Sequence, residues 1–387
     1  MPRRLRNNPL LFVYLLSFFF TLHVAVPVYI ESSFLGTLVS EKSVGIIFAL
    51  AYGLSAIALF VIPRVLRVLG DFRVTLLLLA AETAVYFGLG FLRDPLLLII
   101  LFIVSFALIY LISFDLDLIV ESFSKNANTG SVRGLYLTSS NIALVLAPTL
   151  AAGILTDGDY WRVFVAAAVF LIPALVIFAR KFTGFKDPPY RVVPLLGTLR
   201  RVLRSRDLRA SFLVSFLLQF FFTAMVIYTP LYLHMNLGFA WGDIGLIFSI
   251  MLVPFLILEA PLGRLADRVL GEKEMLILGF VITAGATALI SFTTDTSFLT
   301  WAALLFMTRV GASMIEIMDE TYFFKKVDGK DADIVSFKRA IRPLAGAVAP
   351  LAATAILGIV AFKYLFLVLG LVMLLGLVPS SSIRDTR

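Results

Sequence analysis

Ionisable side chains lie inside several long apolar runs of this 387-residue chain, and they are the residues best placed to do chemistry. A charge at the centre of a membrane-spanning helix costs about 2.5 to 3.5 kcal/mol on insertion scales, so such a group needs a partner or a function. Arg309 lies in the middle of its run and could form a fixed ion pair with an acid on a neighbouring helix. His23 could supply a polar group to a cavity, although a lone histidine is more often a satisfied structural residue.

Acidic residues gather near the ends of two of these runs. Asp115 and Asp117 end one run, and Glu316 lies near the end of another. Burial in an apolar environment favours the neutral form of a carboxyl group, so such a group can take up and release a proton. We therefore predict that Asp115 and Asp117, which lie deeper, and Glu316 are candidates for proton coupling or substrate binding.

Further acids lie one helical turn beyond these, and basic residues begin the run that follows. Glu121 is four residues from Asp117 and Glu320 is four from Glu316, so each pair shares a helix face. The basic residues are Arg133, Lys338, Arg339 and Arg342. The simplest interpretation is an ion-pair latch that closes the cytoplasmic mouth of a helical bundle; substrate binding by Glu121 and Glu320 is the alternative.

A charged loop from Gly263 to Lys273 joins two of the apolar runs and has the composition of a gating hinge. Gly263 and Gly271 allow a close approach of helices, and Leu265 lies between two charged positions. An acid near a helix N-terminus is stabilised by the helix dipole. We predict that Asp267 docks at residues 131–133 when the mouth is shut, while Arg268 stays at the membrane surface.

The elements that must position these residues are membrane-spanning helices. The chain is 60% hydrophobic and 15% charged, and about 20 apolar residues cross the hydrocarbon core as a helix. The runs are too long and too continuously apolar for the strands of a membrane barrel. We predict an all-α bundle of twelve spans, at residues 10–30, 44–63, 74–92, 96–115, 134–155, 162–179, 211–233, 244–262, 274–292, 298–319, 334–361 and 364–379.

The distribution of positive charge predicts the orientation. With the N-terminus in the cytoplasm, 28 of the 33 Lys and Arg fall on the cytoplasmic side, as the positive-inside rule requires. Both termini are then cytoplasmic in a multi-pass protein of the cell membrane. The opening Arg3-Arg4-Leu5-Arg6 is similar to the start of a signal peptide, but no small-residue cleavage site follows, so we interpret the first run as a retained helix.

Several chemistries are disfavoured by what the sequence lacks. The absence of Cys excludes disulfides and thiolate metal ligands, and two distant His make a metal centre improbable. We find no phosphate-binding loop, nucleophile elbow or metal motif, so we expect neither an enzyme nor a cofactor. The net charge of +8 lies in the cytoplasmic loops, so we expect no nucleic-acid partner.

The two halves of the chain resemble each other. Phe18 to Thr21 recurs as Phe220 to Thr223, and five further matches follow in order at nearly the same offset. Six spans per half, an even number, make the halves parallel repeats, which transporters use to expose a central site alternately. We predict a six-helix bundle over residues 1–180, a cytoplasmic linker over 181–210 and a second bundle over 211–387. In the linker, leucines at helical spacing predict a basic amphipathic helix on the membrane surface, with a solvated linker as the alternative.

Together these features resemble the major facilitator superfamily. The loop at Gly263 is similar to that family's signature loop, with Gly263, Leu265, Ala266, Asp267 and Arg268 in place and one extra residue before Gly271. The equivalent loop of the first half, residues 63–73, has Arg67 near the position of the aspartate, which predicts an asymmetric gate. The resemblance also implies that spans 1, 4, 7 and 10 line a cavity, where Arg309 could bind an anionic substrate.

The resemblance implies a secondary transporter that works by alternating access. We expect a proton-linked efflux permease, an antiporter of small amphipathic molecules, that acts as a monomer with lipids around it. Uptake of a sugar or an organic anion is one alternative. A non-transporting membrane sensor or a lipid scramblase is an alternative of another class.

Overall fold

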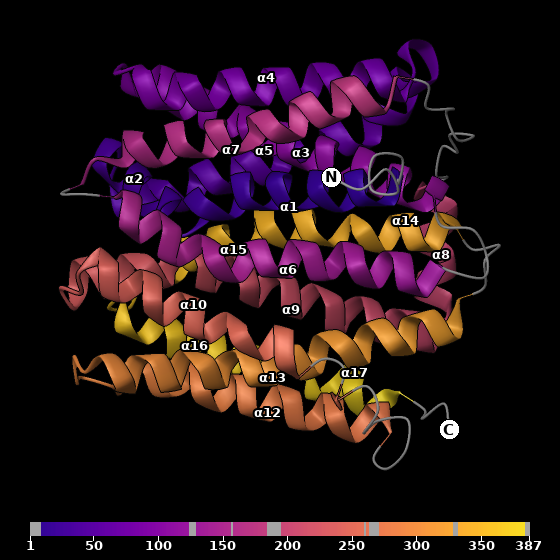
Figure 1. Ribbon diagram of the computed structural model, residues 1–387. Coiled ribbons are helices and arrows are strands. Elements are labelled where there is room, and N and C mark those ends of the chain that lie inside the picture. Colours follow the sequence, from indigo (N-terminus) through magenta and orange to yellow (C-terminus); the bar gives the residue numbers. More distant parts are fainter. Residues whose placement is uncertain are drawn as a thin grey trace. The chain divides into compact units, whose positions relative to one another are not determined.

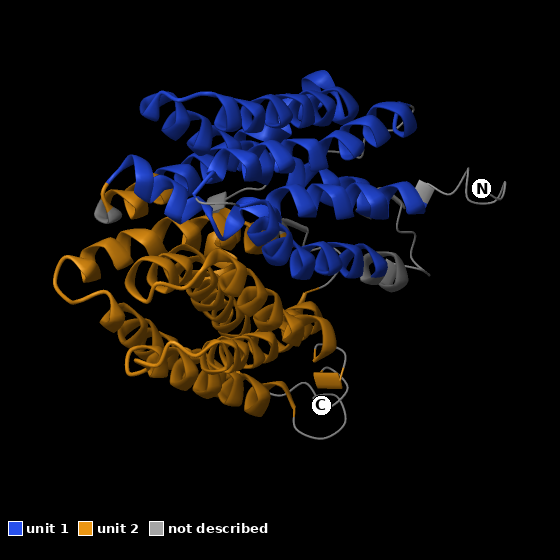
Figure 2. Cartoon of the chain, turned by 60° about the vertical axis from the view of Figure 1, so that its left-hand side comes forward, with its two compact units in different colours: residues 1–39, 50–192 blue, residues 40–49, 193–387 orange. Residues whose placement is uncertain are grey.

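The structure is a computed structural model that describes residues 9–123, 129–155, 158–183, 195–258, 261–262, 271–327 and 332–383. Within these ranges every regular element is a helix (Figure 1). The chain divides into two compact units, shown in separate colours in Figure 2. Unit 1 comprises residues 1–39 and 50–192, and unit 2 comprises residues 40–49 and 193–387.

Unit 1 is built from the helices of the first half of the chain. They are α1 (Pro9–Val28), α2 (Glu31–Leu38), most of α3 (Glu41–Leu69), α4 (Asp71–Phe91), α5 (Pro95–Phe123), α6 (Thr129–Ile154) and α7 (Tyr160–Lys181). Helix α1 packs against α6 and α7, and α4 packs against α5 and α7. Their buried core includes Leu16 of α1, Leu79 of α4, Ile112 of α5 and Phe178 of α7.

Unit 2 contains the helices of the second half. They are α8 (Leu195–Arg204), α9 (Arg206–Leu231) with the π-helical turn η2 (Tyr232–Asn236), α10 (Trp241–Ile257), α12 (Glu272–Ile290), α13 (Phe298–Lys326), α14 (Ala332–Arg339), α15 (Ile341–Leu357), α16 (Lys363–Leu374) and α17 (Leu377–Ser382). Helix α12 packs against α13 and α16, α10 packs against α13, and α9 packs against α15.

The described helices bear out the predicted all-α membrane architecture. Eleven of them are long and apolar enough to cross a bilayer, and α10 is a shorter apolar helix. The predicted run 334–361 is divided at Ala340 into α14 and α15. Helices α5 and α13 continue past their apolar runs to Phe123 and Lys326, because helical hydrogen bonding does not stop where hydropathy falls.

The repeat is visible in how α4 and α12 begin. Gly70 and Gly271 precede them with φ angles of 81° and 82°, a left-handed conformation that glycine adopts without a steric penalty. An acid follows each glycine, Asp71 in α4 and Glu272 in α12, and both side chains are buried. The two halves therefore share a specific helix start as well as sequence matches.

Candidate functional sites within the two units

The predicted hinge lies mostly outside the described residues. Gly263, Leu265, Asp267 and Arg268 fall in that part, whereas Gly271 is described and buried at the start of α12. Glu272, the next residue, pairs with Lys325 of α13 at 2.7 Å between Oε1 and Nζ. The Glu272 side chain is 3% exposed, so this ion pair ties the end of the loop to the end of α13.

A buried polar cluster joins three helices at the end of unit 2 where α9 begins. The Asp319 carboxylate of α13 accepts hydrogen bonds from the hydroxyls of Ser211 and Ser215 of α9. It also pairs with Lys338 of α14 at 3.0 Å, and the Lys338 ammonium lies 4.0 Å from the centre of the Phe323 ring. Since the Asp319 and Lys338 side chains are only 5% and 13% exposed, this pair is shielded from solvent.

The residues predicted to form the ion-pair latch differ in their exposure. Glu320 and Arg342 are exposed, Glu316 and Arg339 are half-buried, and the side chains of Glu121 and Arg133 lie outside the described part. The buried ion pair of this region uses Asp319, the neighbour of Glu320. The sequence signal for it is Ser211 and Ser215, which are four residues apart and so share one face of α9.

Arg309 of α13 is buried, with 2% of its surface exposed. Its guanidinium carbon lies 5.3 Å and 5.4 Å from the ring centres of Phe221 and Phe222 on α9. A cation facing aromatic rings at this distance is attracted by their quadrupoles. The apolar runs of α9 thus supply part of the environment that holds this charge.

Asp115 is fully buried between α5 and α4. Its Oδ2 accepts a hydrogen bond of 2.9 Å from the hydroxyl of Thr75, and the buried Asp71 is a nearby acidic group. Asp117, two residues further along α5, is half-buried. The structure therefore brings Asp115 together with a second acid at one end of unit 1, and a protonated carboxyl would relieve their repulsion.

His23 lies in a second buried cluster of unit 1. Its Nε2 is 3.2 Å from Oε1 of Glu82 on α4, and its Nδ1 is 3.0 Å from the carbonyl oxygen of Ala167 on α7. The ring of Tyr86 is centred 4.2 Å from the His23 ring, and Glu31 of α2 is buried close to Glu82. Sequence reasoning missed Glu31 because it follows the end of the apolar run, where a loop residue is expected.

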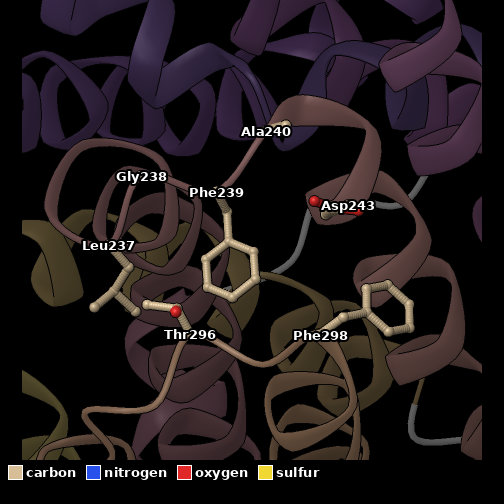
Figure 3. Close-up of a pocket in the computed structure, with 7 residues that line it drawn as sticks. All are labelled: Leu237, Gly238, Phe239, Ala240, Asp243, Thr296 and Phe298. Carbon is tan, nitrogen blue, oxygen red and sulfur yellow. The ribbon is translucent and has the colours of Figure 1, made fainter.

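An open pocket of about 350 Å³ lies in the loops of unit 2 at the start of α10 (Figure 3). Its lining residues are Leu237, Gly238, Phe239, Ala240, Asp243, Thr296 and Phe298. None of the predicted site residues contributes to it. Elsewhere in the described chain, no group of three His, Cys, Asp or Glu could hold a metal ion.

Comparisons with known proteins agree on one architecture. Residues 242–384 match the family model of the Major Facilitator Superfamily. A POT family transporter in complex with a thioalcohol-conjugated peptide has a TM-score of 0.76 at 14% identity, covering 95% of this chain and 94% of its own. No curated protein matches the chain in sequence.

Two further solved structures are similar over nearly the whole chain. A point mutant of the nucleoside transporter NupG has a TM-score of 0.75 at 13% identity, covering 97% of this chain and 100% of its own. A bacterial homolog of the human lysosomal transporter Spinster, inward-facing and unoccupied, has a TM-score of 0.71 at 13% identity, covering 99% and 94%. At these identities the likeness is one of fold.

Proposed function

We propose that the chain is a major facilitator protein, as its fold throughout and its sequence over residues 242–384 indicate, and that it is a proton-linked secondary transporter. The single observation that carries this proposal is the match of nearly its entire length to transporters of that fold. Two of the similar proteins are a transporter in complex with a conjugated peptide and a nucleoside transporter, so we propose a small organic molecule as the substrate class.

Coupling to protons is supported by the carboxyl groups buried within the apolar bundles. Asp115 is fully buried, and among the described residues a threonine hydroxyl is its hydrogen-bond donor. A buried carboxyl without a basic partner is most stable when it carries a proton. Such a group can be loaded on one side of the membrane and unloaded on the other.

Efflux of an apolar or amphipathic molecule is the direction we favour, because the chain has 36 Phe and few charges in its spans. Arg309 supports a second candidate, the uptake of an organic anion. Its guanidinium on α13 faces the rings of Phe221 and Phe222 on α9, and a positive charge there would attract an anionic substrate.

The gate is proposed to depend on Asp267. Substituting Asp267 with Ala should leave membrane insertion intact and slow or abolish transport, because the anion that we propose for the helix N-terminus at residues 131–133 would be removed. The measurement is the initial rate of flux in proteoliposomes at matched protein amounts. Glu274→Ala, an exposed acid early in α12, is the control. An unchanged flux rate for D267A would contradict the proposed role of Asp267 in the gate.

Flux in proteoliposomes with an imposed pH gradient and a mixed-compound library tests the function as a whole. We expect the pH gradient to drive the movement of at least one solute. D115N should abolish this movement but retain the exchange of solute that occurs when no gradient is imposed. D94N, an exposed cap of α5, is the matched control. The absence of flux for every solute would instead favour the sensor or lipid scramblase.

A further inference from the structure

His23, Glu31, Glu82 and Tyr86 form a buried cluster in unit 1. The hydrogen bonds of His23 limit which of these groups can carry a proton. A backbone carbonyl can only accept, so Nδ1 of His23 carries a hydrogen and donates it to Ala167 at 3.0 Å. The contact of 3.2 Å between Nε2 and Glu82 then needs one more proton. Either neutral His23 accepts from the protonated Glu82 carboxyl, or charged His23 donates to the carboxylate.

Both arrangements give the His23–Glu82 pair a net charge of zero. Removing the shared proton would leave a carboxylate facing a nitrogen lone pair in a site where both side chains are 0% exposed. Such a buried, unpaired charge is strongly disfavoured. The pair therefore holds its proton, and any proton that this cluster exchanges is bound elsewhere within it.

Glu31 is the remaining carboxyl group, at the start of α2, and it is 3% exposed. The titratable groups that face it are Glu82 and Tyr86 of α4, with His23 of α1 beyond them. Among the described residues no Lys or Arg forms an ion pair with Glu31 or Glu82. A negative charge on Glu31 would therefore be uncompensated.

Aromatic side chains of α2, α4 and α7 line the cluster. Phe34, one turn after Glu31, contacts Phe164 and Tyr160 of α7 at ring separations of 4.7 Å and 6.0 Å. Phe164 also contacts Tyr86 at 5.9 Å. Polar atoms without a protein hydrogen-bond partner lie in the same region, namely Oε2 of Glu82 and the hydroxyls of Ser32 and Ser33. These atoms could form hydrogen bonds with a proton that moves to or from Glu31.

We propose that Glu31 is a second site, besides Asp115, that binds and releases a coupling proton, and that the neutral His23–Glu82 pair positions it. This assignment rests on the proposed proton-linked transport. Glu31 lies outside the membrane-spanning helices, and burial is the main cause that raises its pKa from 4.5 to about 8. It would thus exchange its proton near neutral pH, within reach of one membrane face.

Infrared spectroscopy of the purified full-length protein, without substrate, tests proton binding directly. The wild type should lose one carboxylic acid C=O band as the pH rises through about 8, and E31Q should lack that band. D159N, which alters an acid before α7 whose side chain is 44% exposed, should retain it. If E31Q does not fold, E31D should show a band that titrates at a different pH. A wild-type band that survives in E31Q, or in E31D at an unchanged pH, would overturn the assignment.

Transport measurements separate this proposal from the function on which it rests. E31Q should lose solute movement driven by a pH gradient and keep exchange without a gradient. Gradient-driven movement that persists in E31Q after loss of the band would overturn the coupling role. If the wild type moves no solute but E31Q removes the band, proton binding at Glu31 stands and the transporter proposal fails.

Discussion

Asp319 and Glu320 are adjacent in the sequence but lie on different faces of α13. Asp319 is buried against α9 and α14, whereas Glu320 is exposed. One residue corresponds to about 100° of rotation around a helix, so neighbouring acids can have entirely different surroundings. Asp319 has two serine donors and an ammonium group, and its carboxylate is satisfied as an anion.

Substituting Asp319 with Ala should destabilise the protein by about 3 kcal/mol, since Lys338 would be left as a shielded charge without its carboxylate. The measurement is the apparent Tm in a nonionic detergent. Asp207→Ala is the matched control, because its pair with Lys326 is more accessible, with side chains 27% and 28% exposed. That change should cost less than about 1 kcal/mol. Equal losses in the two variants would contradict a special role for Asp319.

Titration of Glu31 should make the free energy of unfolding depend on pH. Its pKa is 4.5 when unfolded and about 8 when folded, so over this interval the folded state binds more protons. Stability should therefore fall as the pH rises from about 4.5 to about 8 and then level off. E31Q should flatten this slope in the apparent Tm, and D159N should not. A slope unchanged by E31Q would place the titrating group elsewhere.

Helices α12 and α13 show how small residues set the distance between two elements. A Cβ atom added to Gly311 would lie 2.7 Å from the carbonyl oxygen of Gly279, and one added to Gly279 would lie 2.9 Å from that of Gly311. The backbones thus touch where both residues lack a side chain, an arrangement that strengthens packing in membranes. Gly311 is two residues from Arg309, so this contact also fixes the rotation of α13.

Gly311→Ala should destabilise the protein by about 1 to 3 kcal/mol, because the two backbones would have to separate. Gly285 of α12 provides a control, as nothing lies within 4 Å of an added Cβ. Gly285→Ala should be neutral or stabilise the protein by up to about 1 kcal/mol, since alanine is the better helix former. The measurement is the thermal unfolding of the two variants. Similar changes in apparent Tm would mean that the backbones of α12 and α13 are not in close contact at Gly311.

The basic helix α8 (Leu195–Arg204) lies within the predicted linker, residues 181–210. Thr198 and Val202 are buried in unit 2, whereas Leu199 and Leu203 are exposed beside arginines. One stripe of the helix therefore packs against the bundle. The second apolar stripe is available to the membrane, and its binding to anionic lipid stays a prediction.

The whole molecule contains no cysteine, so single cysteines can report its orientation without a background. The positive-inside distribution predicts that the loop before α13 lies outside and the end of α17 lies in the cytoplasm. A membrane-impermeant maleimide should label Thr294→Cys on intact cells, and Ser381→Cys only after permeabilisation. Both positions are exposed. The reverse pattern would show that the orientation is inverted.

The number of spans, the two parallel halves and the family resemblance could be predicted from the sequence, because crossing hydrocarbon demands long apolar helices whatever their partners. The sequence did not predict that Glu31 lies beside Glu82 or that Asp319 forms a buried ion pair with Lys338. Lipid is as apolar as the interior of a bundle, so the hydrophobic pattern of a run does not show which face of the helix packs against another helix. The contact of His23 with Glu82, 59 residues away, depends on the rotation and tilt of each helix, and only the tertiary structure decides these.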